Sequence, residues 1–389
     1  MIDSMSLEDS FVLPTYEKFP FVLDRGEGCW VWDEAGNKYL DLYGGHAVAA
    51  IGHSPAVVTN AIAAQSAKLL FYSNLVYLKV RAEAAKSLVD FCGEKGSQVF
   101  FCNSGAEANE NAMRIARCVT GKTKIIAAEG GFHGRTAAAI AATGYKYRKN
   151  MSGLGADIVH VPFGDLAAAE KALADDAAAF LLEPIQSVQG ATTATNEYLQ
   201  GLEALCKKSG ALLIFDEVQT GLGRVGAASA RHAFQARPDL QTFAKALASG
   251  VPAGAVLATP EVSAKVKPGA LGSTFGGGPL ASVAISATIK AIVDQNLVEN
   301  AADMEELIRA TFKFPQIKEI RGKGLLLGLV LDRPSKAVRD ALLAKKIIVG
   351  GADDVNVIRL LPPLTVGPTE IGLLRGALEE IFASEAVAA

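Results

Sequence analysis

The sequence has no marked excess of one charge sign. Lysine and arginine number 38 and aspartate and glutamate 41, which leaves a net charge of −3 over 389 residues. A protein that holds nucleic acid or an anionic membrane by electrostatics usually carries a basic patch or stripe. The composition therefore gives no support to a nucleic-acid or membrane partner, and it favours chemistry on small molecules.

Long apolar runs are missing as well. The longest near-continuous one, Leu325 to Leu331, is far shorter than the ~20 residues that cross a bilayer as a helix. The first ten residues, MIDSMSLEDS, are acidic where a secretory signal would be basic and then apolar. We therefore expect no membrane span and no export, which indicates a cytoplasmic protein.

Cysteines are few and show no pairing pattern. The five are Cys29, Cys92, Cys102, Cys118 and Cys206. They form no CxxC pair, and none stands at metal-ligand spacing from a histidine. We expect reduced, mostly packed thiols and no metal site.

The composition does provide for a folded enzyme. Half of the residues are apolar and 20% are charged, and 389 residues suggest two or three domains at roughly 150 residues each. From about residue 98, short β-branched or aromatic runs alternate with Ala-rich segments at helical spacing, which predicts an α/β fold with a buried, mainly parallel sheet. The expected strands are Gln98–Cys102, Lys124–Glu129, Asp157–Pro162, Ala178–Pro184, Ala211–Glu217 and Ala253–Thr259.

The two ends of the chain differ from this middle part. Residues 21–43 resemble a hairpin-rich start with a turn at 34–37, and the tail mixes helix with a strand at 324–332. We therefore predict a large domain at 51–288 and a smaller α+β domain assembled from 1–50 and 289–389.

The segment Asn103-Ser104-Gly105-Ala106-Glu107 follows the first expected strand and opens a helix. Gly105 allows backbone N–H groups to approach an anion at the positive helix end, which predicts a phosphate cradle without a P-loop lysine. The alternative is an ordinary capping box formed by Ser104 and Glu107.

Asp216 and Lys245 are the other two candidates for chemistry. Asp216 ends the run ALLIFDEV, at the carboxyl edge where α/β sheets bind ligands. It could hold the N–H of a pyridinium ring, or it could cap the next turn. Glu217, the next residue, is the competing candidate for either role. Lys245 stands among small and apolar residues in TFAKALA, where burial would lower its pKa and free the amine for a Schiff base; the alternative is a solvated lysine on a helix edge.

Taken in order, these motifs resemble the class III aminotransferases of fold-type I, which depend on pyridoxal 5′-phosphate, and most closely the acetylornithine and succinylornithine aminotransferases. The resemblance spans nearly the whole chain. It rests on LDLYGGH at 40–46 with GHSP at 52–55, NSGAEAN at 103–109, FHGRT at 132–136, FDEVQTG at 215–221, AKA at 244–246 and STFGG at 273–277.

The resemblance implies a role for each matching residue. Ser104, Gly105 and Ala106 would bind the cofactor phosphate, Phe132 and Val218 would pack on the two ring faces, Asp216 would pair with the ring nitrogen and Gln219 with the phenolic oxygen. Lys245 would carry the cofactor as an aldimine and move the proton. Thr274 would reach the phosphate of the neighbouring active site in a homodimer, while His133 would lie behind the cofactor and His46 and His53 would be structural.

Two arginines resemble the carboxylate clamps of the family. Arg135 follows the ring-stacking segment, and Arg359 stands in the apolar run VIRLLPP, where a buried arginine needs an acidic partner or ligand. Arg135 would hold the far carboxylate of 2-oxoglutarate or the α-carboxylate of an ω-amino donor, and Arg359 the α-carboxylate of glutamate.

The resemblance implies transfer of the terminal amino group of N-acetylornithine or N-succinylornithine to 2-oxoglutarate, of the arginine-biosynthesis type. One position departs from the pattern, because the run EPIQ continues with Ser187 and Val188 where these enzymes usually have Gly and a Glu that covers the second arginine. Ornithine, 4-aminobutyrate or a carrier-linked lysine therefore remain alternative donors. An aminomutase or racemase is a further alternative, which Arg359 disfavours.

Overall fold

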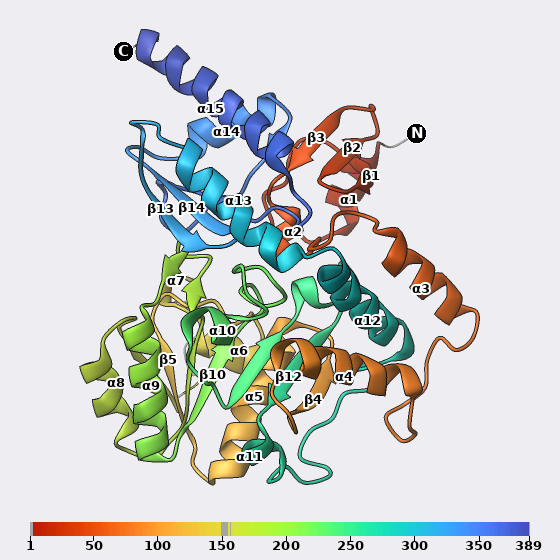
Figure 1. Cartoon of the computed structure of the whole chain (residues 1–389), viewed down its shortest axis with the longest axis vertical. Coiled ribbons are helices and arrows are strands. Elements are labelled where there is room, and N and C mark those ends of the chain that lie inside the picture. Colours follow the sequence, from red (N-terminus) through yellow and green to blue (C-terminus); the bar gives the residue numbers. More distant parts are fainter. Residues whose placement is uncertain (1–2, 149–154, 156, 389) are drawn as a thin grey trace.

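The computed structural model describes residues 3–148, 155 and 157–388. Figure 1 shows two bodies: the lower one contains the large sheet, and the upper one combines the N-terminal strands with helices from the end of the chain. These helices are α13 (Leu297–Thr311), α14 (Lys336–Ala344) and α15 (Pro368–Ala388). Among the described residues, no helix is long and apolar enough to cross a membrane.

The lower body is built on a seven-stranded sheet whose pairings are parallel except at β12, which runs antiparallel to both neighbours. The order across the sheet is β4 (Gln98–Cys102), β12 (Gly254–Ala258), β11 (Leu240–Phe243), β10 (Leu212–Asp216), β7 (Ala177–Leu182), β5 (Lys124–Ala128) and β6 (Ile158–Val161). The six strands expected from the sequence are confirmed, with ends that differ by at most two residues.

Strand β11 was not among the expected strands. Its central residues are Gln241 and Thr242, so its sequence lacks an apolar run. Both are buried and hydrogen-bonded: Gln241 Nε2 donates to Glu217 at 3.0 Å, and Thr242 Oγ1 donates to Asn109 at 2.7 Å. Tertiary partners compensate the burial of these polar groups, and hydrophobic periodicity does not reveal such partners.

Helices cover both faces of this sheet. On one face lies α5 (Gly105–Thr120), and on the other lie α8 (Leu166–Leu173) and α9 (Asn196–Ser209), while α4 (Lys79–Cys92) and α12 (Pro279–Asp294) pack together beside α3 (Ala56–Ser66). Along β10, Ile214 packs with the cluster of α5 and Phe215 with that of α9. A strand buried on both faces must be apolar at successive positions, which explains the near-continuous apolar sequence of β10.

The upper body takes strands from both ends of the chain. A four-stranded sheet consists of β1 (Leu23–Glu27), β2 (Trp30–Asp33), β3 (Lys38–Asp41) and, parallel to β3, β15 (Ile347–Ile348). A three-stranded sheet consists of β13 (Ile317–Lys323), β14 (Leu326–Leu331) and β16 (Val357–Leu360). The turn at 34–37 joins β2 to β3, as expected, and the predicted strand at 324–332 corresponds to β14.

Short elements connect these layers. They are α1 (Ser4–Phe11), α2 (Gly44–Ala47), α6 (Ala137–Ala142), α7 (Tyr145–Arg148), β8 (Ile185–Gln186), β9 (Thr192–Thr193), α10 (Ala230–Phe234), the 3₁₀ helix η1 (Lys245–Ala248) and α11 (Pro260–Ser263). The five cysteines are free, and all but Cys118 are buried.

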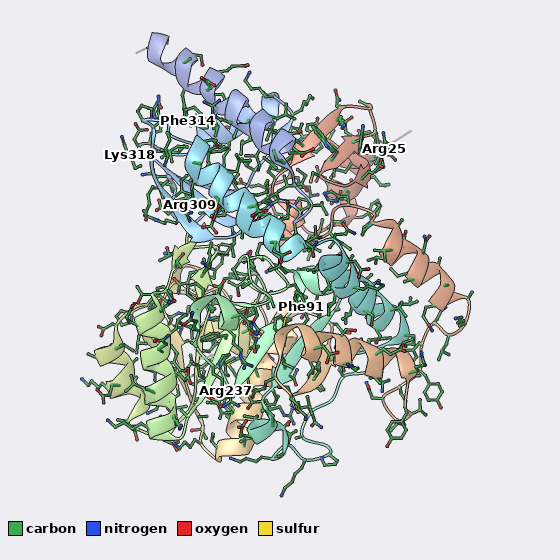
Figure 2. The ribbon with its side chains drawn as sticks, in the orientation of Figure 1. Arg25, Phe91, Arg237, Arg309, Phe314 and Lys318 are labelled. Carbon is green, nitrogen blue, oxygen red and sulfur yellow. The ribbon has the colours of Figure 1, made fainter. Side chains whose placement is uncertain are left out.

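Aromatic and arginine side chains hold the upper body together (Figure 2). The ring of Phe314 lies 6.2 Å from that of Phe312 and 5.4 Å from that of Phe382. Arg309 donates to the carbonyl oxygens of Ile320 and Gly322 at 2.6 and 2.7 Å. These contacts fasten α13 and α15 to the β13 edge of the sheet that carries β16.

One buried arginine joins the two bodies. Arg224 donates through Nη1 to the carbonyl oxygens of Leu325, at 3.1 Å, and Pro362, and Leu325 N donates back to Arg224 O at 2.8 Å. Burial lowers the pKa of Arg224 to about 9. Because Leu325 precedes β14 and Pro362 follows β16, the arginine positions the β16 strand against the large sheet.

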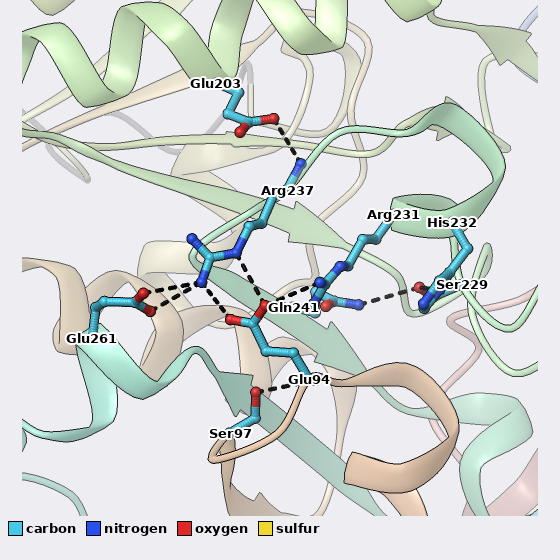
Figure 3. A network of polar contacts seen from close by, with 9 residues as sticks. All are labelled: Glu94, Ser97, Glu203, Ser229, Arg231, His232, Arg237, Gln241 and Glu261. Atoms are coloured by element: carbon cyan, nitrogen blue, oxygen red, sulfur yellow. Dashed lines mark hydrogen bonds and ion pairs between the residues drawn. The ribbon is translucent and has the colours of Figure 1, made fainter.

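A network of ion pairs ties four parts of the lower body together (Figure 3). Glu94, in the loop after α4, pairs with Arg237 and, at 3.1 Å, with Arg231. Arg237 also pairs with Glu261 of α11 at 3.0 Å, and its backbone N donates to Glu203 of α9 at 2.8 Å. Both arginines hold the pKa of Glu94 below its usual value.

We predict that Glu94→Gln lowers the free energy of unfolding by about 1 kcal/mol, because it removes the centre of this network, whereas isolated surface pairs contribute less. The loss should shrink in 1 M salt, which screens exposed charges. Urea unfolding at low and high salt measures it. Glu306→Gln is the control, since Glu306 is exposed and has no ion pair among the described residues; equal losses in both variants would contradict the prediction.

Candidate active site

A cavity of about 310 Å³ lies at the carboxyl edge of the large sheet. The carboxyl ends of parallel strands meet at one edge, where α/β proteins bind their ligands. The segments that line it are Asn103 to Ala106 after β4, Phe132 to Gly134 after β5, Asp216 and Val218 at the end of β10, and Ala244 and Lys245 after β11. The structure therefore brings the candidate cofactor-binding residues into one place, except Thr274 and the buried Gln219, which do not line this cavity.

Ser104 is the N-cap of α5, and its Oγ accepts a hydrogen bond from Glu107 N at 3.1 Å. Glu107 does not return a bond to Ser104; its carboxylate accepts from Asn103 N and Nδ2 at 3.1 and 3.0 Å. The helix still leaves first-turn N–H groups without helical partners, and Gly105 and Ala106 line the cavity. The cap and an anion site are therefore compatible here.

Gly105 allows a close approach at this cradle. A Cβ at that position would lie 3.0 Å from both γ-carbons of Val218. The missing side chain leaves room between the helix end and the wall formed by Val218.

Asp216 is buried with 2% of its surface exposed. Its Oδ2 accepts from Asn109 Nδ2 at 2.7 Å and faces His133 Nδ1 at 2.8 Å, while Oδ1 accepts from Val218 N at 3.0 Å. Donors of this kind stabilise the charged carboxylate. Asp216 therefore both caps the following turn and presents a negative charge to the cavity.

The competitor Glu217 does not line this cavity. Its carboxylate accepts from Ala230 N at 2.5 Å, from Gln241 Nε2 at 3.0 Å and from Thr220 Oγ1 at 3.3 Å. Burial raises the pKa of Glu217 to about 7. Successive residues of a strand point to opposite faces, which explains why only one of these two acids reaches the site.

His133 fixes Asp216 from behind. Its ring is fully buried, its Nδ1 must carry the proton that bonds the carboxylate, and its Nε2 has no partner among the described residues. Of the other histidines, His53 bonds Asp41 at 2.8 Å. His46 packs on Tyr43, and its pKa is lowered by burial and by the charges of Arg359 and Lys245.

Lys245 begins η1 with a φ of 44°, a left-handed conformation that side chains rarely adopt. Its Nζ forms no hydrogen bond or ion pair with a described residue. Loss of water around the amine lowers the pKa of Lys245, and this effect outweighs the opposing charges of Asp216 and Glu183. The alternative of a solvated lysine on a helix edge is wrong, because Lys245 lines the cavity and burial removes water from its amine.

Sequence reasoning did not assign a role to Glu183, which lies directly after β7. Its Oε1 accepts from Phe132 N at 2.8 Å and so holds the ring-stacking segment. Burial, and then the nearby charge of Asp216, raise the pKa of Glu183 to about 7. Its place at the carboxyl end of a central strand was the signal that could have identified it. Tyr147, whose ring lies 5.2 Å from that of Phe132, had no such signal.

Arg359 lies on β16 with 8% of its surface exposed, and it pairs with no carboxylate of a described residue. Its three donor groups bond Gly351 O at 2.5 Å, Ser187 Oγ at 3.2 Å and the hydroxyl of Tyr43 at 2.7 Å. The glutamines near Val188 do not cover it: Gln186 donates to Glu129 O at 2.7 Å, and Gln189 has no bond to it. Within the part of the chain that the structure describes, only neutral groups therefore hold this guanidinium.

Arg135 is exposed and has no ion pair among the residues that the structure describes. Its guanidinium carbon lies 5.5 Å from the ring centre of Tyr147 and 5.9 Å from those of Phe132 and Tyr16. Aromatic faces attract a cation without neutralising it. Thr274 is also exposed and does not line the cavity of its own chain.

The sequence profile of the class-III aminotransferases matches residues 12–382. The chain belongs to this family. The acetylornithine aminotransferase of Methanothermobacter thermautotrophicus is 41% identical over 94% of this chain and 95% of its own length, and that of Bacillus subtilis is 39% identical over 96% and 98%. As a member of this family, the protein is a pyridoxal-phosphate-dependent aminotransferase of fold-type I.

Solved structures agree with this assignment. The ornithine aminotransferase of Toxoplasma gondii ME49 superposes with a TM-score of 0.92 at 30% identity, over 99% of this chain and 95% of that one. The acetylornithine aminotransferase of Elizabethkingia anophelis superposes with a TM-score of 0.84 at 32% identity, over 97% and 98%. A second structure of the Toxoplasma enzyme, crystallised in the presence of oxidised glutathione, has partial occupancy of the cofactor at its active site.

The cavity of this class III enzyme fits pyridoxal phosphate. The α5 end offers N–H groups for a phosphate, the missing side chain of Gly105 opens space beside Val218, and Asp216 and Lys245 supply an acid and an amine on the same lining. The phosphate, the ring nitrogen and the aldehyde of the cofactor thus each have a group of matching chemistry on this lining.

We predict that borohydride reduction of the yellow holoenzyme, followed by peptide mapping, places the cofactor on Lys245. Its lowered pKa makes the amine available for bond formation with an aldehyde. Lys245→Ala should abolish turnover and labelling while phosphate-based affinity remains, whereas the exposed Lys290→Ala should behave as the wild type. Label on any other lysine would overturn the assignment.

Proposed function

We propose that this aminotransferase moves the terminal amino group of N-acetylornithine, or of its close relative N-succinylornithine, to 2-oxoglutarate. The products are the semialdehyde and glutamate. Relatives named acetylornithine aminotransferase, 38 to 41% identical over at least 94% of this chain, support the donor. The observation that carries the acceptor is the pair of arginines, Arg135 and Arg359, neither of which has a carboxylate partner among the described residues.

We assign the cofactor-binding roles that the family implies, and all of these residues except Gln219 line the cavity. Ser104, Gly105 and Ala106 bind the phosphate; Phe132 and Val218 enclose the ring; Asp216 pairs with its nitrogen; Gln219 pairs with its phenolic oxygen. The bound cofactor supplies an aldehyde that takes up the amino group and a ring that withdraws electrons from the substrate carbon. Hydrogen bonds from Asn109 and His133 hold the Asp216 carboxylate in place for this contact.

Lys245 acts as the general acid and base. Burial lowers the pKa of the Lys245 amine, which favours the neutral form that accepts a proton from the substrate carbon and returns it to the cofactor side. Glu183 holds the Phe132 segment in place by accepting from the backbone N–H of Phe132. The charges of Asp216 and Lys245 act on its carboxyl group.

The two arginines recognise the substrates by their carboxylate groups. A dicarboxylate such as 2-oxoglutarate matches two guanidinium groups, whereas an ω-amino donor offers one carboxylate, which we assign to Arg135. Arg359 then binds the α-carboxylate of glutamate. Ornithine is the second candidate donor, because the ornithine aminotransferase of Toxoplasma gondii superposes so closely.

We also propose that the functional unit is a homodimer. Large apolar side chains stay exposed on the segment from Leu69 to Tyr77 and at Phe275, whose ring lies 5.3 Å from that of Phe71. Asn74 ties this segment to the carbonyl oxygens of Ser273 and Gly276, beside exposed Thr274. Contiguous exposed apolar surface marks an interaction site, and here it would bring Thr274 to the neighbouring cavity.

Arg135→Ala should lower kcat/KM for both the donor and 2-oxoglutarate by roughly a hundredfold or more, because each substrate loses a charge-assisted contact. Arg135→Lys should restore little, since an ammonium lacks the planar fork. Steady-state kinetics of each half-reaction measure both. Unchanged kinetics for donor and acceptor would show that Arg135 has a structural role only.

Val188 should set the preference between donors. With no carboxylate over Arg359, the succinyl group of N-succinylornithine gains a cationic partner that the neutral acetyl group does not use. We expect the wild type to favour the succinyl donor and Val188→Glu to shift the ratio of the two kcat/KM values towards the acetyl donor, while the uncharged Val188→Gln leaves it near the wild-type value. A wild-type preference for the acetyl donor that Val188→Glu does not alter would contradict this reading of Arg359.

A further inference from the structure

Ser187 lies between Arg359, the arginine to which we assign the α-carboxylate of glutamate, and Gln219, to which we assign the phenolic oxygen of the cofactor. It follows β8, it is fully buried, and its Oγ is 3.2 Å from Arg359 Nη1 and 3.0 Å from Gln219 Oε1. No other side chain among the described residues bonds both Arg359 and Gln219. A single hydroxyl therefore links a residue of the upper body to a residue after β10 in the lower body.

The direction of these hydrogen bonds is determined by chemistry. A guanidinium has donors and no acceptor, so the Ser187 oxygen must accept from Arg359. The hydroxyl has one proton, which is left for an acceptor, and Gln219 must therefore present its oxygen to Ser187. Its Nε2 amide group then points away from the serine, with no partner among the described residues.

The other hydrogen-bond partners of Arg359 carry no negative charge. Tyr43 OH and Gly351 O accept from the remaining two donor groups. The two successive residues Ser187 and Val188 differ in what they offer to Arg359. Here a hydroxyl holds the arginine from one position, and an apolar side chain occupies the other.

We propose that Ser187 is a positioning residue that couples occupation of Arg359 to the hydrogen bond which Gln219 offers to the cofactor. The proposal rests on the function proposed above, in which Arg359 binds a carboxylate and Gln219 faces the phenolic oxygen. A carboxylate that binds the remaining protons of Arg359 makes the guanidinium a weaker donor to Ser187, and a hydroxyl oxygen that accepts less strongly also donates less strongly. The amide of Gln219 then has a weaker anchor when a dicarboxylate is bound.

Two measurements on the holoenzyme test the proposal. The first is the dissociation constant of glutarate, a dicarboxylate that cannot react, which should rise about tenfold in Ser187→Ala because Arg359 loses a positioning bond to a charged group. The second is the pH at which the visible absorbance of the holoenzyme changes. It should shift in Ser187→Ala in the same direction as in Gln219→Ala, and the double variant should shift no further than Gln219→Ala alone.

The control is Ser229→Ala, which removes another fully buried hydroxyl, bonded to His232 and Gln241. It should leave both measurements at wild-type values, and Ser187→Gly should repeat the result of Ser187→Ala. Unchanged glutarate binding in Ser187→Ala, an unmoved absorbance midpoint, or shifts that add in the double variant would each overturn the coupling. If the wild type itself does not bind glutarate, the proposed acceptor fails instead, and the absorbance measurement still tests the link from Ser187 to Gln219.

Discussion

The buried carboxylate of Asp216 is the constraint on which the rest of the site depends. A charge removed from water is tolerated only when donors surround it, and here the donors come from α5, from the segment after β5 and from the turn after β10. Asn109 is in turn fixed by Thr242 of β11. Three central strands and one helix must therefore be in register before these donors surround Asp216, whose charge acts on the neighbouring groups Lys245 and Glu183.

The positive charge of Arg359, unlike the charge of Asp216, is left largely uncompensated by the protein. No carboxylate compensates it within the described residues; a hydroxyl from each body and a backbone carbonyl hold the guanidinium in position. This leaves most of its charge for a ligand. Asp216 is thus satisfied by the protein and Arg359 is not, which fits one residue that serves a resident cofactor and another that serves exchanging substrates.

Local pattern was enough to predict much of the fold. Strands such as β7 and β10 are apolar on both faces, and burial between two helix layers requires that sequence, so six strands of the large sheet could be recognised. Strand β11 could not, because its polar residues Gln241 and Thr242 are satisfied by partners far away in the chain. Likewise, the run that ends in Asp216 and Glu217 indicated a catalytic acid, but only the alternation of faces in the folded strand separates the two.

The sequence by itself determined the family, the sheet and the motif residues. These motifs, such as a glycine at a helix end or a lysine among apolar neighbours, consist of residues that are adjacent in the chain, so they can be recognised without the fold. Only the tertiary structure decided what surrounds those residues. Ser187 lies beside Arg359 across 172 positions of sequence, and Glu183 holds Phe132 across 51. Contacts of this kind depend on which strands meet at the carboxyl edge and on how the two bodies are joined, and no periodicity in the chain encodes them.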